Sequence, residues 1–283
     1  KDLRYSNTYK ILTFLIKYFT QSNSIAVSFG SPLDVFGNRV NNKGDKIKEN
    51  NLSFLKNNKS KNKNYYFDSK LKKEIKLDID IFLNKHIKNK LSITNIPIIS
   101  EEDPETKLNR KKYKKYWIID PLDGSFNYYR GILSCSISIA FFKNDKIIFG
   151  VIGEYPSENI YWGGKKIGSF LNKKKINCSI IQDIKRSIIA TGFPSRFNFE
   201  NKKLNIYLAY FKKFAKVRMI GSASLSLAYL SEGKFDAYHE ENIMLWDIAA
   251  GLAILEGAGG NYKIKVNKNL LCNVTATNNK LNL

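Results

Sequence analysis

The spacing of apolar residues predicts two early helices separated by a long polar stretch. Residues 8–22 carry apolar side chains at helical intervals, and the same period resumes from about Glu74. From residue 30 to 73, Asn, Lys, Gly and Ser dominate and no apolar period is visible. We expect this Lys/Asn-rich stretch near 30–73 to be an insertion without chemistry of its own.

Short apolar runs in the first part of the chain predict the strands of a meander, with a turn at Asn144 and Asp145. The predicted strands are residues 96–100, Tyr116–Ile119, Ser134–Phe142, Lys146–Tyr155 and Asn159–Gly163. This pattern favours an α+β unit built on an antiparallel sheet.

Helices and strands alternate in the second part of the chain. The predicted helices are 200–215, 222–233 and 245–260, and the predicted strands are 216–221 and 235–240. Glycines end the last helix, as is common at helix C-termini. Alternation is typical of an α/β arrangement. We therefore expect two subdomains of one catalytic unit, an N-terminal α+β half at 1–180 and a C-terminal α/β half at 181–283.

The formal net charge of +22 comes from 47 Lys and Arg against 25 Asp and Glu. Most of these basic residues are Lys spread along the whole chain, whereas nucleic-acid readers also use Arg forks. We therefore do not expect nucleic acid as a partner, although the positive field should attract anionic substrates.

The cysteine content and the hydropathy of the chain indicate in which cellular compartment the protein is expected. Three cysteines without a Cys-x-x-Cys pair argue against a disulfide framework or a zinc site. No apolar stretch reaches the length of a membrane span, and no cleavage site follows the first apolar segment. We expect a cytoplasmic protein without a membrane partner.

The run Trp-Ile-Ile-Asp-Pro-Leu-Asp-Gly-Ser at 117–125 carries the clearest chemical signal. An apolar strand ends at Asp120, Pro121 fixes the turn, Asp123 follows, and Gly124 lets the backbone approach a ligand. Oxygen ligands on a short turn suit Mg²⁺, and the N-terminus of a following helix suits phosphate. Metal and phosphate together indicate phosphoryl chemistry.

Other carboxylates stand at the ends of predicted elements. Glu101 and Glu102 follow a strand, where an acidic pair is typical of a solvated turn. Asp247 opens an apolar helix, either as its N-cap or as a metal ligand held at the helix N-terminus. For each residue alone, a structural role (solvated turn or N-cap) and a role as metal ligand are about equally favoured. Together with Asp120 and Asp123, these residues favour a metal site.

Together with four other segments, the run at 117–125 resembles the inositol monophosphatase family of Mg²⁺-dependent, lithium-sensitive phosphatases. The matching segments are SEED at 100–103, WIIDPLDGSFN at 117–127, IATGFP at 189–194, GSASLSLAYLSEGKFDAY at 221–238 and LWDIAAGLAILEGAGG at 245–260. The resemblance covers the opening helix and nearly everything after Glu74. It implies an α+β fold, the layered αβαβα sandwich of the inositol monophosphatase and sugar phosphatase type.

By position, the resemblance implies metal ligands at Glu101, Asp120, the backbone carbonyl of Leu122, Asp123 and Asp247. It implies two or three Mg²⁺ ions, with Asp120 bridging two of them. Such a pair of ions steadies the attacking and leaving oxygens and activates a water, so no covalent phospho-enzyme is expected.

The resemblance also implies catalytic roles for Glu101, Ser125 and Asp78. Ser125 stands at a Thr position of the family and keeps the hydroxyl that helps to activate the water. Asp78 matches the upstream Asp that orients this hydroxyl, and Asp80 competes for the role because Ile75 replaces a family Thr.

Substrate contacts follow from the same resemblance. The phosphate is expected beside Asp123, on the backbone amides of Gly124 and Ser125, where a helix dipole favours negative charge. Glu240 matches a carboxylate that accepts a substrate hydroxyl, with a solvated strand end as the alternative interpretation. The remaining matched substrate contacts are Gly221, Ser222 and Ala223.

The resemblance thus implies a hydrolase of a small phosphorylated polyol or sugar, with inositol monophosphate as the leading candidate. Within the superfamily, 3′-phosphoadenosine 5′-phosphate, fructose 1,6-bisphosphate and histidinol phosphate are alternatives. From another class, the alternative is a binding protein for RNA or a transcription complex with little catalytic role, which only the charge supports. The resemblance also implies a homodimer.

Overall fold

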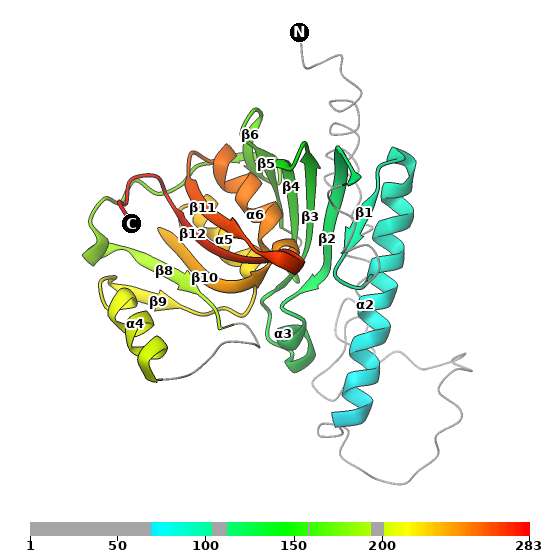
Figure 1. Ribbon diagram of the computed structural model, residues 1–283, viewed down its shortest axis with the longest axis horizontal. Helices are drawn as coiled ribbons and strands as arrows, with labels where there is room; N and C mark the ends of the chain where they lie inside the picture. The colour runs from blue at the N-terminus through cyan, green and yellow to red at the C-terminus, as the bar shows by residue number, and fades with distance from the viewer. Residues whose placement is uncertain (1–68, 104–111, 158, 194–200) are drawn as a thin grey trace, which may run out of the picture.

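The computed structural model describes residues 69–103, 112–157, 159–193 and 201–283, and this part of the chain forms five layers (Figure 1). A helix, a sheet, a pair of helices, a second sheet and a further helix follow one another across the molecule. The helix predicted at 8–22 and residues 30–68 of the Lys/Asn-rich stretch lie outside the described residues.

The first sheet has seven strands that are neighbours in chain order. They are β1 (Ile98–Ser100), β2 (Lys115–Asp123), β3 (Cys135–Lys143), β4 (Lys146–Tyr155), β5 (Ile160–Gly164), β6 (Gly168–Leu171) and β7 (Lys174–Ile176). Strand β1 is parallel to β2, and the other pairs are antiparallel. The predicted meander is confirmed; β6 and β7 were not predicted, because Lys and Gly interrupt their short apolar pattern.

The second sheet is mixed, with the order β11-β12-β10-β8-β9. Its strands are β8 (Ile188–Thr191), β9 (Lys216–Arg218), β10 (Ala237–Met244), β11 (Asn261–Val266) and β12 (Leu271–Thr277). Strands β8, β9 and β10 are parallel, whereas β12 is antiparallel to both β10 and β11. Strand β9 is shorter than the predicted 216–221 because the chain turns at Gly221, whose φ is +74°.

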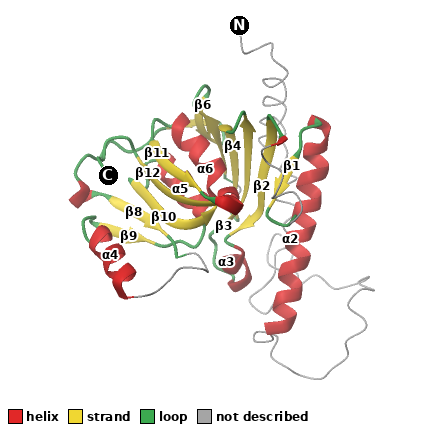
Figure 2. Cartoon of the chain, viewed as in Figure 1, coloured by secondary structure: helices red, strands yellow, loops and turns green. Residues whose placement is uncertain are grey.

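In the described part of the chain, five α-helices connect and cover the sheets (Figure 2). They are α2 (Ser69–Leu91), α3 (Ser125–Arg130), α4 (Asn201–Phe211), α5 (Ala223–Ser231) and α6 (Leu245–Gly257), with 3₁₀ turns at Ser92–Thr94, Ile184–Arg186 and Lys268–Leu270. Helix α2 begins before Glu74, so the end predicted for the polar stretch at residue 73 is wrong. Lys and Leu are good helix formers, which explains why residues 69–73 join the helix. Helix α4 ends at Phe211, earlier than the predicted residue 215.

Helices α5 and α6 form the central layer between the two sheets. Leu227 and Leu252 are completely buried there, in one apolar cluster with Ile118 of the first sheet and Val274 of the second. A helix that is apolar on all sides is stable only when it is buried on all sides. The close packing explains Gly251, because a Cβ there would lie 2.4 Å from the Leu227 Cβ.

Two outer helices complete the sandwich. Leu83, Ile87 and Leu91 of α2 pack in one cluster with Trp117 on the outer face of the first sheet. Tyr207 and Phe211 of α4 cover the second sheet. The αβαβα sandwich expected from the resemblance is confirmed. Within the described ranges, no helix is both long and apolar enough to cross a membrane.

Candidate metal centre and adjoining cavity

Strands β1 and β2 place Glu101 beside Asp120. The two strands run parallel with Ser100 opposite Ile119, so the residue that follows each of these two is an acid, Glu101 directly after β1 and Asp120 within β2. The Glu101 amide donates to the carbonyl of Ile119 at 3.2 Å and holds this register. The short strand predicted at 96–100 therefore delivers its carboxylate to the run at 117–125.

A bulge in β2 puts Asp120 and Asp123 at one end of the sheet. Asp120 pairs with Ser138 of β3 and Asp123 pairs with Ser136, so three steps on β2 match two on β3. Such bulges bend a strand, and Pro121 within it has no amide to lose from the ladder. The Leu122 amide donates to Asp120 Oδ1 at 2.9 Å. The strand thus runs to Asp123 instead of ending at Asp120 as predicted.

Asp247 comes from the second half of the chain, on the first turn of α6. It is the third residue of the helix and Met244 is the N-cap, so the N-cap interpretation of Asp247 is wrong. The Ser138 hydroxyl donates to the carbonyl of Trp246 at 3.1 Å and fastens this helix end to β3. The helix dipole favours a negative charge at this end.

Glu101, Asp120 and Asp247 form a carboxylate triad whose ligand oxygens all lie within 4.8 Å of one another. Burial raises the pKa of Asp120 well above its usual value, and the charges of Glu101, Asp247 and Asp123 raise it further. Asp247 is partly exposed, yet desolvation of its carboxyl group, then the Asp123 and Glu101 charges, also raise its pKa well above normal. Like charges this close favour a proton or a cation between them. An all-oxygen donor set fits a hard divalent cation such as Mg²⁺.

Asp123 lies outside this triad and is held by neutral donors. Its Oδ2 accepts from the Ser222 hydroxyl at 2.7 Å, the Ser224 amide at 2.7 Å and the Ser224 hydroxyl at 2.5 Å. Burial raises the pKa of Asp123, and these hydrogen bonds oppose the shift. Ser222 is also the N-cap of α5, so the carboxylate is tied to the start of that helix.

The Asn127 side chain joins the loop after β2 to the turn before α5. Its Nδ2 donates to the carbonyl oxygens of Ser134 and Ile220, each at 2.7 Å. Gly124 has φ +80°, and a Cβ there would lie 2.8 Å from the Ser134 carbonyl oxygen. Gly221, on the other side, has no room for a Cβ against the Asn127 amide. These hydrogen bonds of Asn127 hold the amides of Gly124 and Ser125, which are expected to bind phosphate, next to the turn at 221–223.

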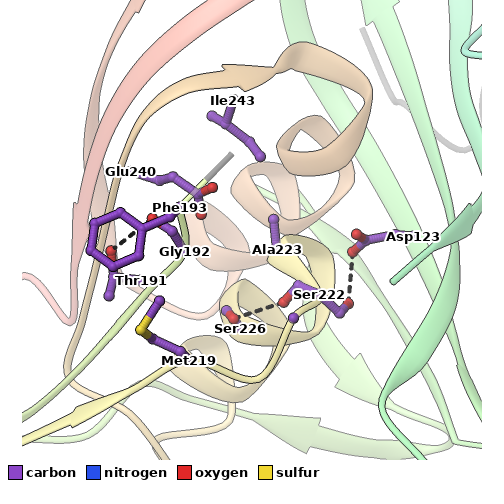
Figure 3. A pocket seen from close by; sticks show the side chains of 11 residues that line it. Asp123, Thr191, Gly192, Phe193, Met219, Ser222, Ala223, Ser226, Glu240 and Ile243 are labelled. Atoms are coloured by element: carbon purple, nitrogen blue, oxygen red, sulfur yellow. Dashed lines mark hydrogen bonds between the residues drawn. The ribbon is translucent and has the colours of Figure 1, made fainter. Parts of the chain in front are cut away.

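Asp123 lines a cavity of about 300 Å³ (Figure 3). Its polar lining comprises Asp123, Thr191, Ser222, Ser226 and Glu240. Its other lining residues are Gly192, Phe193, Met219, Gly221, Ala223 and Ile243. Figure 3 shows Phe193 and Met219 on the side of the cavity opposite Asp123.

Most hydroxyl groups of the cavity wall already donate within the protein. Thr191 donates to the carbonyl of His239 and Ser226 to that of Ser222, each at 2.7 Å. Glu240 differs, because it offers carboxylate oxygens and is only 5% exposed. Burial raises its pKa to about 7, Tyr238 opposes the shift by a hydrogen bond, and Asp123 adds to it. The alternative of a solvated strand end for Glu240 is wrong.

Of the remaining predicted site residues, the structure describes the side chains of some but not of all. Ser125 is the first residue of α3, directly after Gly124. Asp78 lies within α2, but its side chain is outside the described part of the chain, whereas Asp80 is buried on that helix at 6% exposure. Asn84, one turn further on, accepts from the Ser100 hydroxyl at 2.8 Å, directly before Glu101.

Sequence reasoning missed Ser224, Phe193 and Met219 as site residues. Ser224 and Phe193 lie inside segments that carried the family resemblance, so a signal for them was present. Met219 follows a strand of three exposed residues, and no sequence pattern marks it as part of a cavity.

Comparisons of the sequence with known proteins find related proteins. A sequence model of the inositol monophosphatase family matches residues 43–276. The chain is 36% identical over 152 residues to a fructose-1,6-bisphosphatase/inositol-1-monophosphatase of Aquifex aeolicus, covering 52% of this chain and 56% of that one. It is 35% identical to a Nus factor SuhB of Xylella fastidiosa over 145 residues, covering 51% and 53%.

A solved structure has a similar fold. The extragenic suppressor protein suhB of Bartonella henselae superimposes with a TM-score of 0.63 at 29% identity, covering 71% of this chain and 79% of that chain. The chain spans about half the length of the curated relatives it matches.

Proposed function

This chain belongs to the inositol monophosphatase family, and on that basis we propose that it is a Mg²⁺-dependent hydrolase of phosphate monoesters. Its substrate is a small phosphorylated polyol or sugar, and inositol monophosphate is the leading candidate. The observation that carries the proposal is the meeting of Glu101, Asp120 and Asp247, which come from three separate segments of the chain. The neighbouring carboxylate of Asp123 lines a cavity that Glu240 also lines.

The triad would hold the metal, with Asp123 and the carbonyl of Leu122 as additional oxygen ligands. When bound, Mg²⁺ would supply charge stabilisation to the phosphoryl oxygens and lower the pKa of a coordinated water. The triad fits this role because its carboxyl groups repel one another unless a proton or a cation intervenes.

The chain's own residues position the ester. The backbone amides of Gly124 and Ser125, at the start of α3, would bind the phosphate. The hydrogen bonds of Asn127 to the carbonyls of Ser134 and Ile220 hold this loop close to the turn at Gly221. Ser125 would orient the attacking water through its hydroxyl. We propose Asp80 as the Asp that orients Ser125, with Asp78 as the alternative. Asp80 is buried on α2, and Asn84 of the same helix binds Ser100, the residue before Glu101.

Glu240 would accept a hydroxyl of the leaving alcohol. The hydroxyl groups of Thr191, Ser222 and Ser226 already donate to protein acceptors, so an acidic acceptor is the main polar feature of the wall. An ionised carboxylate only accepts hydrogen bonds, and a polyol supplies donors. Hydrolysis transfers the phosphoryl group to water and releases this alcohol and inorganic phosphate.

Phosphate release from a panel of esters tests the proposal. The panel comprises inositol phosphates, sugar phosphates, fructose 1,6-bisphosphate and 3′-phosphoadenosine 5′-phosphate, each with Mg²⁺ and with EDTA. We expect metal-dependent release, fastest with a polyol or sugar monophosphate. No release from any ester, by folded protein that binds Mg²⁺, would contradict the proposal.

One observation favours a nucleotide as the second candidate substrate. Phe193 and Met219 give the cavity an apolar wall, which suits the face of a nucleobase better than a fully hydroxylated ring. Faster release from 3′-phosphoadenosine 5′-phosphate than from inositol monophosphate would establish this alternative.

Relatives named Nus factor SuhB support a candidate of another class, a role in a transcription complex. This role predicts nucleic-acid or protein binding without turnover, and nucleic-acid affinity that falls steeply with salt. The intact triad favours the hydrolase.

A further inference from the structure

Tyr238 is a buried tyrosine whose side-chain hydroxyl contacts Glu240, a residue that lines the cavity. It lies on β10, two residues before Glu240, so both side chains project from the same face of the strand. Its ring is completely buried in the central apolar cluster. Its hydroxyl donates to Glu240 Oε2 at 2.7 Å.

The backbone at Gly192, directly after β8, also packs against this carboxylate. A Cβ on Gly192 would lie 2.6 Å from Glu240 Oε2 and 2.8 Å from Oε1. The carboxylate therefore packs directly against the main chain at this glycine. A phenol hydroxyl and a bare glycine together hold a side chain that otherwise has three rotatable bonds.

We propose that Tyr238 is a positioning residue that fixes Glu240, so that one carboxylate oxygen is occupied by the phenol and the other receives a substrate hydroxyl. The inference rests on the proposed function, because it assigns Glu240 to the leaving alcohol. It also narrows the substrate class to esters whose leaving alcohol carries a further free hydroxyl group. Holding Glu240 in place before binding reduces the side-chain entropy lost when that hydroxyl binds.

A structural role alone would give a different pattern of effects. Loss of a buried hydrogen bond that only stabilises the fold lowers turnover of every substrate alike, through the fraction of folded protein. Loss of a positioning contact lowers kcat/KM only for substrates that use Glu240. Discrimination between two substrates therefore separates the roles.

The test measures kcat and KM of Tyr238→Phe with inositol 1-phosphate and with p-nitrophenyl phosphate, whose leaving group has no further hydroxyl. We expect kcat/KM to fall about tenfold more for inositol 1-phosphate, mainly through KM, as one charge-assisted hydrogen bond allows. In the Glu240→Gln background the same change should add little, because coupled residues are not additive.

Tyr161→Phe is the matched control. Tyr161 is also completely buried and donates to a glutamate, Glu232 Oε2, at 2.8 Å, but neither residue lines the cavity. This variant should leave the ratio of the two kcat/KM values unchanged. Gly192→Ala gives a second route if Tyr238→Phe does not fold, since its Cβ would displace the Glu240 carboxylate and reduce the same ratio.

The outcomes distinguish this inference from the proposed function. Equal losses for both substrates, or a full additional loss in the Glu240→Gln background, would overturn the positioning role while leaving the hydrolase intact. Wild-type protein that hydrolyses neither substrate with Mg²⁺ would overturn the proposed function and this inference with it.

Discussion

Asp120 and Asp123 stand three residues apart on one strand, are both buried, and have opposite surroundings. Asp120 faces the carboxylates of Glu101 and Asp247, whereas Asp123 accepts three hydrogen bonds from Ser222 and Ser224. The region around Asp120 gathers several negative charges, whereas at Asp123 neutral protein donors stabilise a single carboxylate by hydrogen bonds. The bulge between the two residues creates this division.

The difference shows which part of the site is built for a ligand from outside the chain. Burying a charge among like charges costs free energy that a divalent cation can offset. At Asp123 part of the offset is already within the protein, in the hydrogen bonds from the N-terminal turn of α5, although burial still leaves its pKa raised. We therefore expect the free energy of the triad to change most if Mg²⁺ binds, whereas Asp123, close to the triad, also lines the cavity.

Removing a triad carboxylate should have the largest effect on activity. Asp247→Asn keeps the shape of the first turn of α6 but weakens metal binding. We expect kcat to fall by about three orders of magnitude, since metal-ion stabilisation supplies several kcal/mol. Steady-state phosphate release and a thermal melt measure activity and folding on the same sample. Near-normal turnover would remove Asp247 from the site.

The two aspartates should respond oppositely when stability is measured without metal. Because folding raises the pKa of Asp120, its contribution to stability is lost as the pH rises above the unfolded carboxyl pKa of about 4. Asp120→Asn should therefore stabilise the protein at pH 7 in EDTA and abolish stabilisation by Mg²⁺. Asp123→Ala should destabilise it by about 1–3 kcal/mol, because three donors lose their acceptor.

Urea unfolding at pH 7, with EDTA or Mg²⁺, measures both variants of this pair. A loss of stability in Asp120→Asn without metal would mean that the triad is already neutralised within the protein. The contrast between the two regions would then fail.

Glu240, in the cavity wall, adds a prediction about how substrate discrimination depends on pH. Its pKa is raised to about 7, so the acceptor-only carboxylate predominates at pH 8 and the neutral acid at pH 6. We expect kcat/KM for inositol 1-phosphate, relative to p-nitrophenyl phosphate, to rise several-fold, up to about tenfold, across this interval. Glu240→Gln should flatten the ratio.

The same shift predicts a stability effect with the opposite direction. Because folding raises the pKa of Glu240 above its unfolded value of about 4.3, stability falls progressively as the pH rises from there to about 7. Glu240→Gln should remove this part of the pH dependence in urea unfolding. An unchanged pH profile in the variant would show that another group titrates.

The smallest expected effect is at Ser125. Thr restores a methyl group that restricts the side-chain rotamer, so Ser125→Thr should change kcat by about twofold or less. Ser125→Ala is the matched variant without the hydroxyl and should be far slower. Equal rates for the Ala and Thr variants would exclude the hydroxyl from water orientation.

Much of the fold was predictable because its elements carry local signals. The period through Leu83, Ile87 and Leu91 gave α2, and the apolar runs gave β2 to β5. The parallel pairing of β1 with β2 was not predictable, since it depends on contacts between distant segments. The division near residue 180 stays a prediction, because α5 and α6 pack on both sheets.

For the site, the family resemblance pointed to the carboxylates, and the structure adds the burial and the hydrogen bonds of the described ones. The sequence matched Asp78 to the Asp that orients Ser125, with Asp80 as a competitor, and we propose Asp80 because its side chain is buried on α2. The hydrogen bonds from Ser224 to Asp123 and from Tyr238 to Glu240 follow from three-dimensional packing and left no separate trace in the sequence pattern.

The most direct test of the metal centre is phosphate release from inositol 1-phosphate by wild-type protein and Asp120→Asn as Mg²⁺ is titrated. The account predicts that the wild-type rate rises from background to saturation with Mg²⁺ and returns to background with EDTA. It also predicts that Asp120→Asn stays near background at every concentration while remaining folded. Release that is independent of Mg²⁺, or equal in the two proteins, would contradict the assignment of the triad as the catalytic metal site.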